Sequence, residues 1–112
     1  MDPQRDLELA SLLIKAQDGD KLAYERFLGE IARILRMYLR KRLRDGDQVE
    51  DVVQETLMTV HRVRQTYQPG RPVGPWLYAI CESRRIDFLR KVQRIQAREV
   101  PWEDEFIDFW VS

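Results

Sequence analysis

Residues 47–63, with the sequence DQVEDVVQETLMTVHRV, indicate the fold class of this chain. Their apolar side chains recur at steps of three and four residues: Val49, Val52, Val53, Leu57, Val60 and Val63. Although valine is common in strands, this spacing follows the 3.6-residue period of a helix and not the two-residue period of a strand. The segment is therefore predicted to be an amphipathic helix that begins near Asp47, with Glu50 completing a capping box.

Helices are predicted on both sides of this segment, so the expected fold class is all-α, a compact bundle of about four helices. A short helix is expected over residues 7–16, and a long one over residues 21–43 with Asp20 as its N-cap. The long helix has an apolar stripe formed by Tyr24, Phe27, Leu28, Ile31, Leu35, Tyr38 and Leu39. A loop rich in proline and glycine, residues 68–75, precedes a fourth helix expected over residues 75–96.

The composition excludes several classes of protein. The 112 residues suffice for one small domain, and no apolar run approaches the roughly 20 residues that span a bilayer. The acidic N-terminus lacks the features of a signal peptide, so a cytoplasmic protein is expected. Cys81 and His61 are the only cysteine and histidine, which excludes an internal disulfide and a Cys/His metal site. No catalytic or cofactor-binding motif is present, so we expect no enzyme, no cofactor and no metal. Cys81 is expected in the core and His61 on the surface.

Charge is segregated along the chain, although its 19 basic and 19 acidic residues cancel. Residues 21–44 contain 8 basic and 2 acidic groups, and residues 61–98 contain 9 and 2. The blocks 1–20, 45–60 and 99–112 are acidic. Such segregation suits separate faces for different partners, with phosphates as candidates for the basic blocks; solvated helix faces are the alternative.

Two helix faces are candidate binding surfaces. On the predicted helix 47–63, four residues form an exposed strip opposite the valines: Asp51, Gln54, Glu55 and Met58. This strip suits a basic partner helix, because methionine adds an adaptable apolar contact to the acidic groups.

On the fourth helix one face combines cations with an aromatic ring: Trp76, Ser83, Asp87, Arg90, Lys91, Arg94 and Arg98. Charge for phosphates and a ring for a base suit nucleic acid. The nearby loop adds Tyr67 and Arg71, which could hold an unstacked base. Arg84 and Arg85 fall at the edge of the apolar sector, where they either extend to solvent or face a partner.

Three motifs in this order resemble a known family. DVVQE at residues 51–55, then WLYAI at residues 76–80 and DFLRK at residues 87–91, are similar to the conserved second region of extracytoplasmic-function (ECF) sigma factors of RNA polymerase. LLIKAQDGD at residues 12–20 resembles the start of that region. The resemblance covers about residues 7–95, and residues 1–98 are expected to form the whole region 2 domain.

The resemblance implies that the domain docks on the clamp helices of the polymerase β′ subunit and recognises and melts the promoter −10 element. The implied polymerase-binding residues are Asp51, Gln54, Glu55 and Met58. A flipped base of the single-stranded non-template strand would be captured by the loop and the fourth helix. The implied DNA-binding residues are Tyr67, Arg71, Trp76, Ser83, Arg84, Asp87, Arg90, Lys91 and Arg94. An anti-sigma factor is a further implied partner, and a monomer is expected.

The sequence also departs from the family pattern. Many members have asparagine where Ser83 stands, so the base that is recognised is open. The domain that reads the −35 element is not in this chain, and residues 99–112 resemble the acidic linker that precedes it, although a tail folded on the domain is an alternative. We expect a domain cut from a longer factor; the alternative is a naturally short protein. A competing function is a sigma-like mimic that sequesters an anti-sigma factor without binding DNA. The cationic face of the fourth helix argues against this mimic.

Overall fold

The computed structural model describes residues 1–98, and the predicted linker or tail, residues 99–112, lies outside the described residues. The described part contains four α-helices and one short 3-10 helix, with no strand, which confirms the all-α prediction. The elements in chain order are α1 (Pro3–Gln17), α2 (Lys21–Arg40), α3 (Gly46–Val63), η1 (Arg64–Thr66) and α4 (Val73–Arg98). No helix within residues 1–98 combines the length and apolar character needed to cross a membrane.

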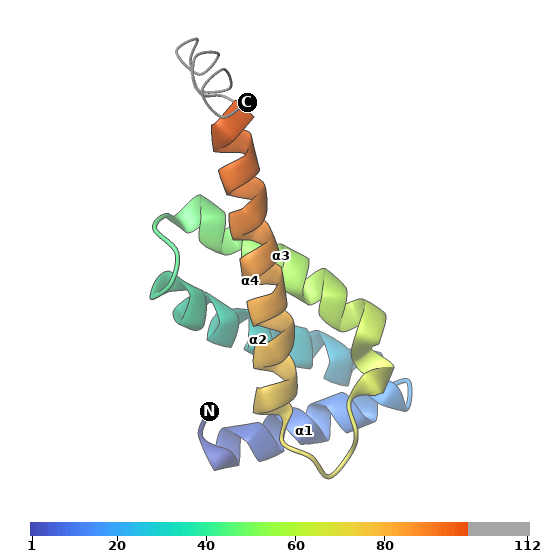
Figure 1. The fold of residues 1–112 in the computed structure, drawn as a ribbon. Coiled ribbons are helices and arrows are strands. Elements are labelled where there is room, and N and C mark those ends of the chain that lie inside the picture. The colour runs from blue at the N-terminus through green and yellow to red at the C-terminus, as the bar shows by residue number, and fades with distance from the viewer. Residues whose placement is uncertain (99–112) are drawn as a thin grey trace.

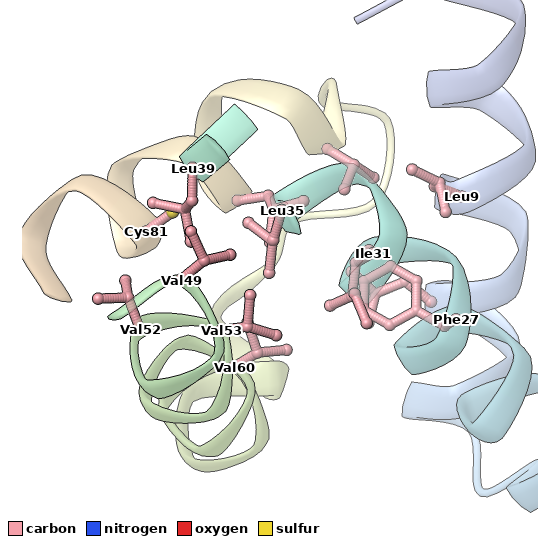
Figure 2. Close-up of a cluster of buried hydrophobic side chains, with 14 of the residues drawn as sticks. Leu9, Phe27, Ile31, Leu35, Leu39, Val49, Val52, Val53, Val60 and Cys81 are labelled. Atoms are coloured by element: carbon pink, nitrogen blue, oxygen red, sulfur yellow. The ribbon is translucent and has the colours of Figure 1, made fainter. Parts of the chain in front are cut away.

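The helices surround one core, in which α2 packs against both α1 and α3, and α4 packs across α3 (Figure 1). Figure 2 shows Phe27 and Ile31 of α2 close to Leu9 of α1, and Val53 and Val60 of α3 on the other side of α2. These side chains are at most 2% exposed, because the apolar stripes of the helices face inward. The residues at the centres of the predicted apolar stripes of α2 and α3 are thus confirmed as core residues.

Two predicted helix boundaries in the first half of the chain differ from the structure by three residues or more. The first helix begins at Pro3, with Asp2 as N-cap, and not near Leu7. The second ends at Arg40 and not near Leu43, although Leu43 is still buried in the turn that follows. The predicted Asp20 cap is confirmed, since its carboxylate accepts a hydrogen bond from the Ala23 N–H at 3.0 Å.

The predicted capping box at Asp47 is wrong. The N-cap of α3 is Asp45, whose carboxylate accepts a hydrogen bond from the Gln48 N–H at 2.8 Å. Glu50 faces α2 instead, where its carboxylate binds the Arg36 Nε at 2.8 Å. That hydrogen bond lowers the pKa of Glu50 and raises the pKa of Arg36. The sequence pattern fits both aspartates, because Gln48 stands three residues after Asp45 and Glu50 three residues after Asp47.

The start of α4 is capped by a residue from the opposite end of the chain. The fourth helix begins at Val73, two residues before the predicted Pro75. The Asp6 carboxylate on α1 accepts hydrogen bonds from the N–H groups of Val73 (2.7 Å) and Gly74 (2.8 Å). These are two of the donors that a helix leaves unsatisfied at its first turn. Asp6 therefore attaches the loop and α4 to α1.

The far end of α4 lies outside the bundle. In Figure 1, α4 crosses α2 and α3, with α1 near its start, and its last turns extend beyond the other helices. All but one of the residues 90–98 are exposed, and the exception, Val92, is half-buried. The first half of α4 is thus fixed by packing, and the last turns stand in solvent.

Candidate functional site

The predicted polymerase-binding strip lies on the solvent side of α3. Asp51, Gln54, Glu55 and Met58 are all exposed, and Met58 keeps 56% of its surface exposed. Within residues 1–98 none of these four side chains forms a hydrogen bond or an ion pair. On the other side of α3, the side chains of Val52, Val53 and Thr56 are buried and fix the helix in position. The strip is therefore a fixed acidic surface with one large apolar side chain, open to a partner.

The predicted DNA-binding residues of α4 lie on one flank of that helix, next to α3. Ser83, Asp87, Arg90, Lys91 and Arg94 are exposed. Asp87 lies between two cations: its Oδ2 is 2.7 Å from the Arg84 Nη2, and its Oδ1 is 4.0 Å from the Arg90 Nη1. Arg84 also donates to the Ser83 hydroxyl at 3.3 Å.

Arg84 links this flank to the interior of the molecule. Its side chain is only 27% exposed, and its Nε is buried without a hydrogen-bond partner among residues 1–98. The Nη2 of the same guanidinium holds Asp87. The prediction that Arg84 and Arg85 sit at the edge of the apolar sector is confirmed, since both are half-buried.

A groove of about 410 Å³ joins the two candidate surfaces. One wall is formed by α3 and the other by α4; the lining residues are Asp51, Gln54, Glu55, Arg84, Asp87, Phe88 and Lys91. Acidic groups of α3 thus face cations of α4 across a narrow space. The sequence predicted each surface by itself. That the two surfaces adjoin depends on how α3 packs against α4, and no local sequence pattern indicates this packing.

The loop before α4 differs from the prediction in one respect. The Tyr67 ring, expected to be available to a base, is only 2% exposed, and its hydroxyl donates to the Arg71 carbonyl at 2.5 Å. Burial is also the main reason that the pKa of Tyr67 is raised. The Gln17 side chain donates to the Tyr67 carbonyl at 2.9 Å, which draws the loop onto α1. Tyr67 is therefore part of the core in this structure, and the loop folds back over it.

Trp76 and Arg71 remain accessible in this region. Arg71 is exposed, and Trp76 is half-buried with its ring edge-on to Tyr67 at 5.8 Å between ring centres. The Trp76 indole N–H donates to the Thr66 hydroxyl at 3.1 Å. Tyr67 and Thr66 thus hold the indole in place from two sides.

A network around Glu82 was missed by the sequence reasoning. Its carboxylate accepts hydrogen bonds from Arg85 at 2.6 and 3.0 Å and from the Tyr38 hydroxyl, and the Arg42 Nε is 3.8 Å away. The hydrogen bonds from Arg85 and then Tyr38 lower the pKa of Glu82. The spacing of Glu82 and Arg85 by three residues was a local signal for this pair. Glu82 thus joins α4 to Tyr38 of α2, and Arg85 is held on that side of α4 by its pairing with Glu82.

The two remaining side chains of reactive types, the Cys81 thiol and the His61 imidazole, do not form a reactive site. Cys81 is fully buried, as predicted, and burial raises the pKa of its thiol to about 11. His61 is exposed, as predicted, and its Nδ1 lies 2.7 Å from the Tyr24 hydroxyl. Within residues 1–98 no three side chains of the metal-ligating types come together.

These features define a class: a small helical domain with an acidic strip on α3 beside a cationic flank on α4. Sequence comparison identifies the family to which this helical domain belongs. The profile of the family described as sigma-70 region 2 matches residues 23–95. The chain belongs to the sigma-70 region 2 family, and the curated relatives described next are RNA polymerase sigma factors, two of them named as ECF sigma factors.

Three curated relatives illustrate the similarity. The chain is 35% identical over 106 residues to the ECF RNA polymerase sigma factor SigF of Caulobacter vibrioides, covering 93% of this chain and 57% of the relative. It is 32% identical over 81 residues to the RNA polymerase sigma factor CarQ of Myxococcus xanthus, covering 72% and 47%. It is 27% identical over 84 residues to the ECF RNA polymerase sigma factor RpoE of Cereibacter sphaeroides, covering 74% and 46%. The chain thus spans about half the length of these relatives. No solved structure gave a significant match.

Proposed function

We propose that this domain acts in transcription initiation by docking on core RNA polymerase and by recognising and melting the promoter −10 element. The observation that supports it most is the groove between α3 and α4, where the two surfaces implied by the family resemblance meet. Polymerase bound to one wall and DNA bound to the other would be held within a single small domain.

The docking half of the proposal assigns the α3 strip to the β′ clamp helices. Asp51 and Glu55 have no cationic partner within residues 1–98, so their charge is available to a basic helix. Met58 projects an apolar side chain beside them. An exposed acidic strip with one methionine suits a basic helix with an apolar ridge.

The DNA half assigns the flank of α4 and the loop to single-stranded non-template DNA. Arg90, Lys91 and Arg94 would contact phosphates. Trp76, held by Thr66 and Tyr67, would stack on a base that has left the duplex, at a cost of a few kcal/mol per unstacked step that the contacts offset. Arg84 would position Asp87 beside Ser83. The buried Tyr67 side chain supports the loop through its hydrogen bond to the Arg71 carbonyl, and the Arg71 side chain lies at the surface of the domain.

The test is a binding measurement with the whole chain. Labelled single-stranded oligonucleotides that vary in the −10 segment are titrated with the chain and core RNA polymerase, and fluorescence anisotropy is followed. We expect sequence-selective binding that weakens as salt is raised. Trp76→Ala and Arg90→Ala should each weaken it about tenfold, corresponding to the 1–3 kcal/mol typical of one stacking contact. Arg26→Ala, an exposed arginine on α2 without an ion pair in residues 1–98, is the control.

The docking surface is tested separately by measuring the affinity of the chain for core polymerase without DNA. Glu55→Lys should weaken the complex strongly, because it places a like charge against a basic helix. Glu25→Lys on α2 makes the same charge change at an exposed site and should not. Equal affinity for scrambled oligonucleotides in the presence of polymerase, together with tight capture of an anti-sigma factor, would replace the proposal by the mimic.

A further inference from the structure

A second and larger hollow lies on the other side of the loop. Its volume is about 1010 Å³, and it runs between α1 and the start of α4. The apolar lining comes from α1 and from the loop with the first turns of α4: Leu7, Ala10, Ile14, Pro72, Pro75 and Tyr78. This α1–α4 groove is concave and mainly apolar, as ligand sites in proteins are.

The α1–α4 groove shares only Tyr67 and Arg71 of the loop with the surfaces assigned above. Tyr78, which lines it, lies on the flank of α4 that faces α2, where its ring is 4.8 Å from that of Tyr38. Asp87 lies on the opposite flank, where it lines the groove beside α3. The proposed function therefore gives a role to the loop at the rim of this groove and none to its α1 wall.

The chemistry of the groove favours an apolar ligand with negative charge. Leu7 keeps 67% of its surface exposed although it belongs to an apolar wall. Asp6, the one acidic lining residue, already accepts two backbone hydrogen bonds. The cations in the lining are Lys15 and Arg71, both exposed and without an ion pair in residues 1–98. The free charge in this groove is thus positive.

The chain contains a segment with the complementary chemistry. Residues 99–112 have five acidic and no basic residues. Their large apolar side chains are Trp102, Phe106, Ile107, Phe109 and Trp110. Aromatic anchors flanked by acidic groups match an apolar groove with a cationic rim.

The length of this segment suffices to reach the groove of the same chain. From Arg98 back to Tyr78 the helix spans about 30 Å, at about 1.5 Å per residue. An extended chain gains about 3.3 Å per residue, so Trp110, twelve residues after Arg98, reaches about 40 Å. Trp102 falls well short at about 13 Å. We propose that Phe109 and Trp110 bind the end of the α1–α4 groove that is lined by Tyr78, in their own chain.

Fluorine NMR of the whole chain labelled with fluorotryptophan tests this proposal. The chain has three tryptophans, and the Trp110 resonance is assigned from Trp110→Phe. We expect this resonance to differ from that of a free peptide of residues 99–112. Leu7→Asp should return it to the free position, with at least a tenfold loss of the bound form.

The matched control is Leu22→Asp, which makes the same change at a leucine of α2 that is 73% exposed and outside the groove. It should leave the resonance in place. A Trp110 resonance at the free position in the unmodified chain, or one insensitive to Leu7→Asp, would overturn the proposal. A shift that disappears on dilution would assign the groove to a second copy instead. The readout involves neither DNA nor polymerase, so its failure is distinct from failure of the proposed function.

Discussion

The carboxylate of Asp6 lies 2.8 Å from the backbone nitrogen of Gly74, 68 residues further along the chain. A Cβ atom at position 74 would lie 3.2 Å from the same carboxylate oxygen, closer than ordinary contact. Glycine at this position therefore allows the carboxylate to approach the first turn of α4. The contact therefore anchors the loop and the start of α4, the helix that contains the candidate DNA flank.

Removing the cap should destabilise the domain. For Asp6→Ala we expect a loss of about 1–2 kcal/mol in the free energy of unfolding, since two helix N–H groups lose their acceptor. Gly74→Ala should cost less, because the carboxylate can shift. Urea denaturation measures both. Gly29→Ala is the control: position 29 is an exposed site within α2 with nothing within 4 Å, where alanine should stabilise by roughly 0.5–1 kcal/mol. Unchanged stability of Asp6→Ala would contradict the capping role.

The cations at the end of α4 should set the salt dependence of DNA binding. If Arg94 contacts a phosphate, Arg94→Gln should reduce the slope of log K against log salt by about 0.7, the value for one contact on a single strand. The measurement is the anisotropy titration at several salt concentrations. Arg33→Gln, at an exposed arginine of α2, should leave the slope unchanged. Equal slopes for Arg94→Gln and the unmodified chain would exclude Arg94 from the interface.

The Glu82 network should contribute stability that depends on pH. The pKa of Glu82 is lowered by its hydrogen bonds, first from Arg85 and then from Tyr38. A carboxyl group whose pKa is lower in the folded state stabilises the fold above its unfolded pKa, and this stabilisation is lost as pH falls through the folded value. Glu82→Gln should therefore cost about 1 kcal/mol at pH 7, and the difference should shrink below about pH 4.5.

Urea unfolding of Glu82→Gln at pH 7, pH 5 and pH 3.5 provides this measurement. Glu25→Gln is the matched control, because Glu25 is exposed and forms no hydrogen bond or ion pair within residues 1–98. A Glu82→Gln difference that stays constant across the pH range would show that the carboxylate charge does not stabilise the fold.

The Cys81 thiol should be inert in the folded protein. Burial raises its pKa to about 11, so the thiolate at pH 8 is about 100-fold or more scarcer than for a free cysteine. A thiol reagent added at pH 8 should label the chain only as fast as it unfolds, and labelling should become rapid in denaturing urea. Rapid labelling without denaturant would mean that the contact between α3 and α4 opens readily, because Cys81 lies in the core there.

Local features of the sequence predicted much of this structure. The apolar stripes of α2 and α3 repeat with the helical period, so Phe27, Ile31 and Val53 could be assigned to the core. The Asp20 cap could be assigned because its partner is three residues away. The acidic strip and the cationic flank could be predicted as exposed faces for the same reason.

Contacts between distant parts of the chain could not be predicted in this way. Asp6 caps a helix that begins 67 residues later, and no spacing rule connects the two. Tyr67 was expected in an exposed loop, but the loop folds back and buries it. Asp45 and not Asp47 is the N-cap of α3, and Glu50, three residues after Asp47, contacts Arg36 of another helix. Each of these depends on tertiary packing, which overrides local pattern.

The last turns of α4, which stand outside the bundle in Figure 1, contain Arg94 and Arg98 and pack against no other helix of residues 1–98. Such turns are subject to a helix–coil equilibrium, because no packed neighbour in the described part of the chain adds to their intrinsic propensity. A phosphate bound by Arg94 would then shift this equilibrium towards the helical state. The cost of ordering the backbone would reduce the net free energy of binding. Amide hydrogen exchange over residues 92–98 should therefore slow when DNA binds, and the affinity should fall with temperature more steeply than the stability of the bundle alone requires.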